Sequence, residues 1–99
     1  MRASSRPEQI GSVLNKALRK SGFQTKLREK RVVLNWESVV GPRISSQAKA
    51  FKVEDSKLFV RVKSAVWKNE LFFQKKDIKD KLNQSVGGKV IKDIIFVNQ

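Results

Sequence analysis

The spacing of the apolar residues changes along this chain, and that change sets the fold class. Up to residue 40 the apolar residues recur every three or four positions, which is the period of one helix face. From Phe51 to Val62 they alternate with polar residues, as in a strand buried on one side. Gly41-Pro42 separates the two patterns. Helices followed by a hairpin predict an α+β domain, with the helices packed on a three-stranded mixed sheet.

The first helix is predicted over residues 6–21. Ser5 and Glu8 have the spacing of a capping box, in which each side chain bonds to a free backbone N–H at the helix start. Pro7 suits the first helical turn, where its missing N–H costs nothing. Gly22 suits the position just after a helix.

A second helix is predicted from about Gln24 to Val40. Residues 32–34 (Val-Val-Leu) are also compatible with a buried strand, but the helical stripe continues through Trp36 without a turn signal. Pro42 can open a short third helix that extends to Ala48, since proline is favoured in a first helical turn.

A hairpin and a long helix are predicted in the second half. Strands over 51–54 and 58–63 flank a turn at Asp55-Ser56. Ser64 can cap a helix that continues to about residue 86 and bends near Gln74.

The chain is predicted to end in a third strand, over residues 90–97, which is rich in β-branched residues. Gly87-Gly88 stops the preceding helix. The expected order is therefore α-α-(α)-β-β-α-β. No repeat or linker divides the sequence, so residues 1–99 are predicted to form one domain with its core within 6–97.

Composition excludes most catalytic classes. The chain has no Cys and no His, so disulfides, thiolate or imidazole metal sites, cysteine nucleophiles and His-based triads are absent. No phosphate-binding loop or serine-nucleophile motif is present either. We expect a protein that is not an enzyme and that holds no cofactor or metal.

The charge predicts a polyanionic partner. Lys and Arg number 22 against 9 Asp and Glu, a formal charge of +13 that is spread over the helical and strand segments alike. An alternative is that the lysines only keep a small protein soluble. The residues expected to contact phosphates through their charge are Lys16, Arg19, Lys20, Lys26, Arg28, Lys30 and Arg31, with Lys75, Lys76 and Lys79 as a second patch.

The aromatic residues divide into core and surface candidates. Trp36 and Trp67 lie on apolar stripes and are predicted to be core anchors, not base-stacking platforms. Phe72 and Phe73 are adjacent on a helix, so both cannot face the core and one is expected on the surface.

Strand parity predicts a second surface. Leu58, Val60, Val62, Ile94 and Phe96 can share the core side of the sheet, so that the intervening residues point away from it. The residues expected to form a docking surface for a protein or a single strand are Phe59, Arg61, Lys63 and Ile95, with Lys52 nearby. The alternative is that one of the first helices covers this face.

No targeting or membrane segment is visible. The longest apolar runs have three or four residues, far short of the roughly 20 that span a bilayer. We expect a cytoplasmic protein with no membrane partner, associated with the nucleoid.

Four segments in order together resemble the DciA family, one of them being the pair Glu70-Leu71. Residues 36–44 (WESVVGPRI) are similar to its W-x-x-V-V-G-x-x-I/L segment, and residues 58–67 (LFVRVKSAVW) to its L-x-V-x-V-x-S-x-x-W pattern. Residues 90–96 (VIKDIIF) are similar to its V-x-D-I-x-F ending.

The resemblance implies a fold similar to a KH domain and a role in bacterial DNA replication. DciA proteins act as operators or loaders of the replicative helicase and bind DNA. The partners expected for this chain are therefore the replicative helicase and single-stranded or duplex DNA, with RNA as an alternative. A KH domain clamps nucleic acid with a G-x-x-G loop, whereas residues 64–85 contain no glycine, so any binding here should rest on the basic surface. The alternatives are an RNA-binding module and a protein-interaction domain whose charge serves solubility.

Overall fold

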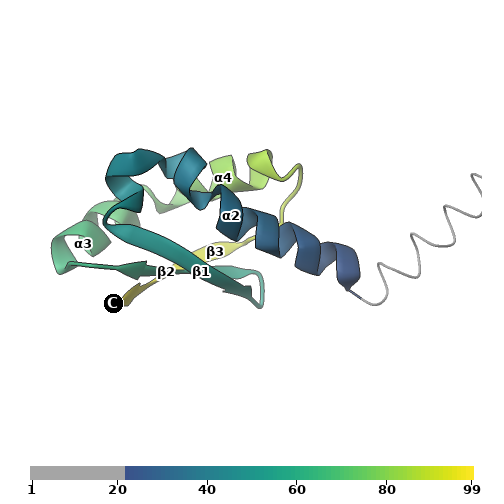
Figure 1. Cartoon of the computed structure of the whole chain (residues 1–99), viewed down its shortest axis with the longest axis horizontal. Helices are drawn as coiled ribbons and strands as arrows, with labels where there is room; N and C mark the ends of the chain where they lie inside the picture. Colours follow the sequence, from purple (N-terminus) through teal and green to yellow (C-terminus); the bar gives the residue numbers. More distant parts are fainter. Residues whose placement is uncertain (1–21) are drawn as a thin grey trace, which may run out of the picture.

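The computed structural model describes residues 22–99, which form three helices and three strands (Figure 1). The predicted helix at 6–21 lies outside the described residues. The elements are, in chain order, α2 (Phe23–Ser45), β1 (Ala48–Glu54), β2 (Lys57–Val62), α3 (Ala65–Phe73), α4 (Lys75–Ser85) and β3 (Asp93–Asn98). The predicted α+β class is confirmed.

The three strands form one mixed sheet in the order β1-β2-β3. β1 and β2 pair antiparallel through a tight hairpin, whereas β2 and β3 pair parallel. A parallel pair needs a long crossover, which α3 and α4 supply. All described helices lie on the same side of the sheet (Figure 1). The fold likeness to a KH domain stays a prediction.

The core lies between that side of the sheet and the helices. Leu58, Val60 and Val62 of β2 are buried, as the strand parity predicted, and Ile94 of β3 joins them. The helices contribute the buried side chains of Val32, Trp36, Leu71, Ile78 and Leu82. The prediction that Trp36 is a core anchor is confirmed: its indole N–H donates to the carbonyl of Ala48, 2.8 Å away.

The helical segment α2 consists of two parts. Gly41 has φ 89° and ψ 166°, a non-helical conformation that favours glycine, and Pro42 starts the last turn. The predicted break at Gly41-Pro42 and the short helix after it are therefore correct. That helix does not extend to Ala48, because Ala48 pairs with Val62 as the first residue of β1.

The hairpin turn falls where it was predicted, at Asp55 and Ser56. Both residues have positive φ, 52° and 62°, as in the type I′ turns that match the twist of antiparallel strands. β1 begins three residues before the predicted strand. Its register shifts between Ala50 and Lys52, which leaves Phe51 in a β-bulge.

The predicted long helix is two helices, α3 and α4. The Ser64 hydroxyl caps α3 by accepting a hydrogen bond from the backbone N–H of Trp67, as predicted. At Gln74 the chain leaves helical geometry with φ −97° and ψ 3°, so the expected bend is a break between two helices. The predicted stop at Gly87-Gly88 is confirmed by Gly87, which has φ 75°.

The last strand starts later than predicted, at Asp93 rather than residue 90. The Asn83 side chain is the reason. Its Oδ1 accepts from the backbone N–H groups of Val90 and Ile91, and its amide donates to the carbonyl of Ile91. These bonds tie residues 90–91 to α4, so they are not available for pairing with β2.

Candidate functional site

One side of the sheet is covered by no helix among residues 22–99. Phe59 of β2 lies beside Lys52 of β1 and Ile95 of β3, and Arg61 lies beside Lys49 and Val97. Cross-strand neighbours share a face, so these side chains point away from the core. We call this the outer sheet face; its members are Lys49, Phe51, Lys52, Phe59, Arg61, Ile95 and Val97.

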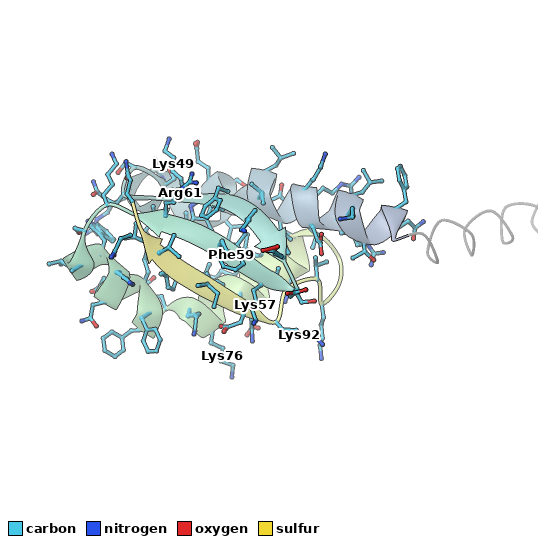
Figure 2. All side chains as sticks on the ribbon, turned by 90° about the horizontal axis from the view of Figure 1, so that it is seen from below. Lys49, Lys57, Phe59, Arg61, Lys76 and Lys92 are labelled. Atoms are coloured by element: carbon cyan, nitrogen blue, oxygen red, sulfur yellow. The ribbon has the colours of Figure 1, made fainter. Side chains whose placement is uncertain are left out.

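Figure 2 views the molecule from the side of the outer sheet face, where Lys49, Phe59 and Arg61 lie on the strands. The prediction that Phe59, Arg61 and Ile95 share a face is therefore borne out by the register. Lys63 follows the last residue of β2 and is exposed. Within the described part of the chain, the alternative that a helix covers this face is not realised.

The aromatic rings of the outer sheet face are each covered by a cation. The Arg61 guanidinium lies 3.9 Å from the ring centroid of Phe51, and the Lys52 ammonium 4.8 Å from that of Phe59. The two rings lie 6.3 Å apart at 55°. The bulge that places Phe51 here was not predicted, because a register shift has no clear sequence signal in this strand.

These contacts fix charged groups on an apolar surface. A cation held over a ring is attracted by the negative ring face. Among residues that flank this surface, Glu54 pairs with Lys52 at 3.0 Å, so its charge is compensated. The outer sheet face is thus apolar and basic, with several of its side chains already ordered.

The predicted basic residues of α2 lie on two different sides of the helix. Lys26 and Lys30 line a groove with Phe51 and Lys52 of β1, so they extend the basic character of the outer sheet face around its edge. Arg28 instead lies near the turn after α4, with Nη1 3.5 Å from the place where a Cβ on Gly88 would be.

Arg31 is three positions after Arg28 and therefore lies on the same side of α2, where it is exposed. The sequence placed these four basic residues opposite the apolar stripe and did not distinguish the two sides, because it did not show that β1 lies along one side of α2 and the loop after α4 along the other. Lys16, Arg19 and Lys20 lie outside the described residues.

The second basic patch adjoins two exposed phenylalanines. Phe72 and Phe73 end α3, and their exposed fractions are 58% and 78%. The prediction that both cannot face the core is confirmed, and in fact neither does. The break at Gln74 brings Lys75 and Lys76 immediately after them. We call these four residues, Phe72, Phe73, Lys75 and Lys76, the aromatic junction.

Lys75 is the constrained cation of the aromatic junction. Its ammonium lies 4.8 Å from the Phe72 ring centroid and 3.1 Å from the Asp93 carboxylate. Burial raises the pKa of Asp93, but the bond from Lys75, the backbone N–H of Ile94 and the charge of Lys79 together hold it below its usual value. Lys75 is thus partly neutralised, while Lys76 and Lys79 make no ion pair within the described part of the chain.

Two further residues, Trp67 and Asp77, contact other residues of the domain in ways that support the fold. Trp67 is partly buried against the core, with the Arg43 guanidinium 5.6 Å from its ring centroid. Asp77 pairs with Lys81 at 3.5 Å on the exposed side of α4.

Among residues 22–99, no group of Asp and Glu is arranged to hold a metal ion, and no helix has the length and apolar character needed to cross a membrane.

Comparison with known proteins gives one family. The family model described as "Dna[CI] antecedent, DciA" matches residues 9–96. A UPF0232 protein of Corynebacterium glutamicum is 30% identical over 87 residues, covering 88% of this chain and 49% of that protein. UPF0232 proteins of Mycobacterium tuberculosis and Mycolicibacterium paratuberculosis are 25% and 28% identical over 89% and 86% of this chain, and 47% of each of those proteins is covered. The chain spans about half the length of these curated relatives.

Proposed function

Because the chain belongs to the DciA family, we propose that it is a non-enzymatic adaptor that binds DNA and assists loading or operation of the bacterial replicative helicase. Family membership ties the chain to helicase loading in DNA replication. The adaptor contributes no bond chemistry; it holds helicase and DNA together and so raises the local concentration of each for the other. Its place of action is the cytoplasm, at the nucleoid.

The outer sheet face is the surface that we assign to the helicase, through Phe59, Arg61 and Ile95, together with Lys63 just after the end of β2. The observation that carries this assignment is the pair of cation-covered rings on an open sheet. Arg and aromatic residues are the side chains that most often dominate protein interfaces. Arg61 and Lys52 are already ordered by Phe51 and Phe59, so less side-chain entropy is lost on binding.

The proposed DNA contacts come from basic side chains at the rims of the molecule. The residues in this proposal are Lys16, Arg19, Lys20, Lys26, Arg28, Lys30 and Arg31, with Lys75, Lys76 and Lys79 as the second patch. Lysine contacts to phosphate position a nucleic acid without reading its sequence. We therefore expect binding that is salt-dependent and indifferent to sequence.

Co-purification with the replicative helicase of the same organism tests the helicase half of the proposal. The full chain should be retained by immobilised helicase, and the Arg61→Glu variant should be retained much less. Lys89→Glu is the matched control, because Lys89 is exposed in the loop between α4 and β3 and is not a residue of the outer sheet face. Absence of binding by the folded wild-type chain at micromolar concentration would remove the helicase from the proposal.

Titration of labelled single-stranded DNA, duplex DNA and RNA at several salt concentrations tests the nucleic-acid half. Binding that weakens steeply with salt is expected, with a log–log slope of about −0.7 per contacted phosphate on single strands and about −0.9 on duplex. A clear preference for RNA would favour an RNA-binding module, and a flat response with no binding would leave only a protein-interaction role.

A further inference from the structure

We propose that the aromatic junction is a stacking site for a base of single-stranded nucleic acid, with the Phe73 ring as the platform and Lys76 and its neighbours on the adjoining phosphates. The inference rests on the proposed function, because it takes nucleic-acid binding as given. It adds where on the molecule the nucleic acid binds and that single-stranded nucleic acid binds there better than duplex. Neither strand parity nor charge alone indicated this site.

The Phe73 ring is open to an incoming base. It is 78% exposed, and it meets Phe72 edge-to-face, with ring centroids 6.3 Å apart and an interplanar angle of 79°. That contact holds the edge of one ring against the face of the other, which fixes Phe73 without covering both of its faces. The rings of Phe51, Phe59 and Phe72 each have a cation over them, whereas no Lys or Arg of residues 22–99 lies over Phe73.

The charges near the ring are suited to a phosphate backbone. Lys76 follows Phe73 by three residues and projects from the start of α4 at the rim of the molecule (Figure 2). Lys79 lies one turn further along α4. Neither makes an ion pair among the described residues. A sequence-tolerant single-strand site combines such cations with an aromatic ring on which a base can stack.

Acidic groups limit the direction that a strand can take. Glu70 lies one turn before Phe73 on the same side of α3, so phosphates would be repelled along that helix. Asp93 is bonded to Lys75, and Asp77 to Lys81, so both carboxylates are compensated. On α4, Lys75, Lys76, Lys79 and Lys81 outnumber Asp77 and Asp80, whereas on α3 the single Lys68 is matched by Glu70. The net positive charge therefore favours a strand path from Phe73 over α4.

A single strand fits this site better than a duplex does. Duplex bases are already stacked on each other, and taking one out of the stack costs a few kcal/mol. A single strand offers a free base face at little cost. Stacking on an aromatic side chain is worth about 1–3 kcal/mol per base, whichever base is present.

The test compares Phe73 variants of the full chain by fluorescence anisotropy. The probes are oligo(dT), oligo(U) and a duplex of the same length. Phe73→Ala and Phe73→Leu should each weaken binding to the single strands roughly tenfold and binding to the duplex less than twofold. Phe73→Trp should restore the affinity. The two single-stranded probes show whether the site favours DNA or RNA.

The matched control is Val66→Ala. Val66 is also 78% exposed and lies two turns before Phe73 on the same side of α3, but it has no ring. Its replacement should leave single-strand affinity unchanged. Equal losses on single strands and duplex, an unchanged affinity in Phe73→Ala, or a loss in Val66→Ala as large as that in Phe73→Ala would each overturn the inference. If the wild-type chain binds nucleic acid and Phe73→Ala binds equally well, this inference fails and the proposed function stands.

Discussion

The outer sheet face and the aromatic junction contain the same kinds of side chain, phenylalanines beside lysine or arginine, but in different arrangements. On the outer sheet face each ring has a cation over it, and the rings belong to a three-stranded sheet. At the aromatic junction the Phe73 ring is 78% exposed, and no Lys or Arg of residues 22–99 lies over it. It stands at the end of α3, near Lys75, which is paired with Asp93, and near Lys76, which makes no ion pair among those residues.

The difference shows that composition does not determine what a basic, aromatic surface binds. A ring with a cation over one face offers an incoming base less free surface, and it presents an ordered Arg or Lys to an acidic protein surface. A bare ring offers its face to a base. We therefore assign the outer sheet face to the helicase and the aromatic junction to a single strand.

The largest expected effect is a loss of stability that differs between the core-facing and outward-facing residues of β2. Leu58 is fully buried and its neighbour Phe59 points the opposite way. Leu58→Ala should lower the free energy of unfolding by about 2–5 kcal/mol through lost burial and the cavity that remains. Phe59→Ala should lower it far less, as measured by urea denaturation. Equal losses would show that the outer sheet face is part of the core and not a binding surface.

A large effect on binding is expected for the double variant Phe59→Ala, Arg61→Glu. It removes a ring and reverses the charge over the neighbouring ring, and truncation of such central interface residues typically costs about 2 kcal/mol or more. Helicase affinity, measured by biolayer interferometry, should fall at least about thirtyfold. Affinity for oligo(dT) should fall much less than helicase affinity, because the double variant changes the net charge of the molecule but no residue of the aromatic junction. A helicase affinity equal to that of wild type would place the docking surface elsewhere.

A smaller effect is expected from Asp93→Asn at the aromatic junction. The change removes the carboxylate that pairs with Lys75 but keeps an oxygen to accept from the backbone N–H of Ile94. Lys75, whose charge Asp93 partly neutralises in the wild type, should then contact its phosphate in full, steepening the salt slope on oligo(dT) by up to about 0.7. An unchanged slope would show that Lys75 does not lie on the path of the strand.

The smallest effect is the pH dependence of stability that comes from the same carboxylate. The pKa of Asp93 is held below its ordinary value of 3.8 in the folded chain. A lowered pKa means that the folded state favours the ionised form, so the stabilisation is present above that ordinary value and is lost as the pH falls through the folded pKa. The pair is partly exposed, so the contribution is small.

Thermal unfolding of wild type and Asp93→Asn across the acidic range provides the measurement. Wild type should be slightly more stable than Asp93→Asn at neutral pH, and the difference should vanish below the folded pKa. A difference that grows as the pH falls would contradict the ion pair with Lys75.

The features predicted from the sequence are those that depend on local spacing. The period of two places Phe59 and Arg61 on the side opposite Val60 whatever the sheet looks like. Turn and cap chemistry likewise gave Asp55-Ser56, Gly41-Pro42 and Ser64, because each depends on the conformational preference of a residue and its immediate neighbours.

The features that were missed depend on tertiary contacts. The bulge at Phe51 is set by how β1 pairs with β2, and the late start of β3 by the hydrogen bonds of Asn83. Lys26 and Arg28 lie on different sides of α2, Lys26 beside β1 and Arg28 beside the loop after α4, and this depends on how those elements pack along the helix. Phe72 and Phe73 are both exposed because the core contact at this end of α3 is Leu71. The break at Gln74, for which the sequence suggested only a bend, ends α3 directly after them.

One measurement tests the division of roles most directly: binding of Arg61→Glu and Phe73→Ala, each as a full chain, to the replicative helicase and to oligo(dT) separately. The two surfaces predict opposite outcomes. Arg61→Glu should lose helicase binding and largely retain oligo(dT), whereas Phe73→Ala should lose affinity for oligo(dT) about tenfold and retain the helicase. If both variants lose the same ligand, or if either loses both ligands while remaining folded, the two surfaces do not have separate roles.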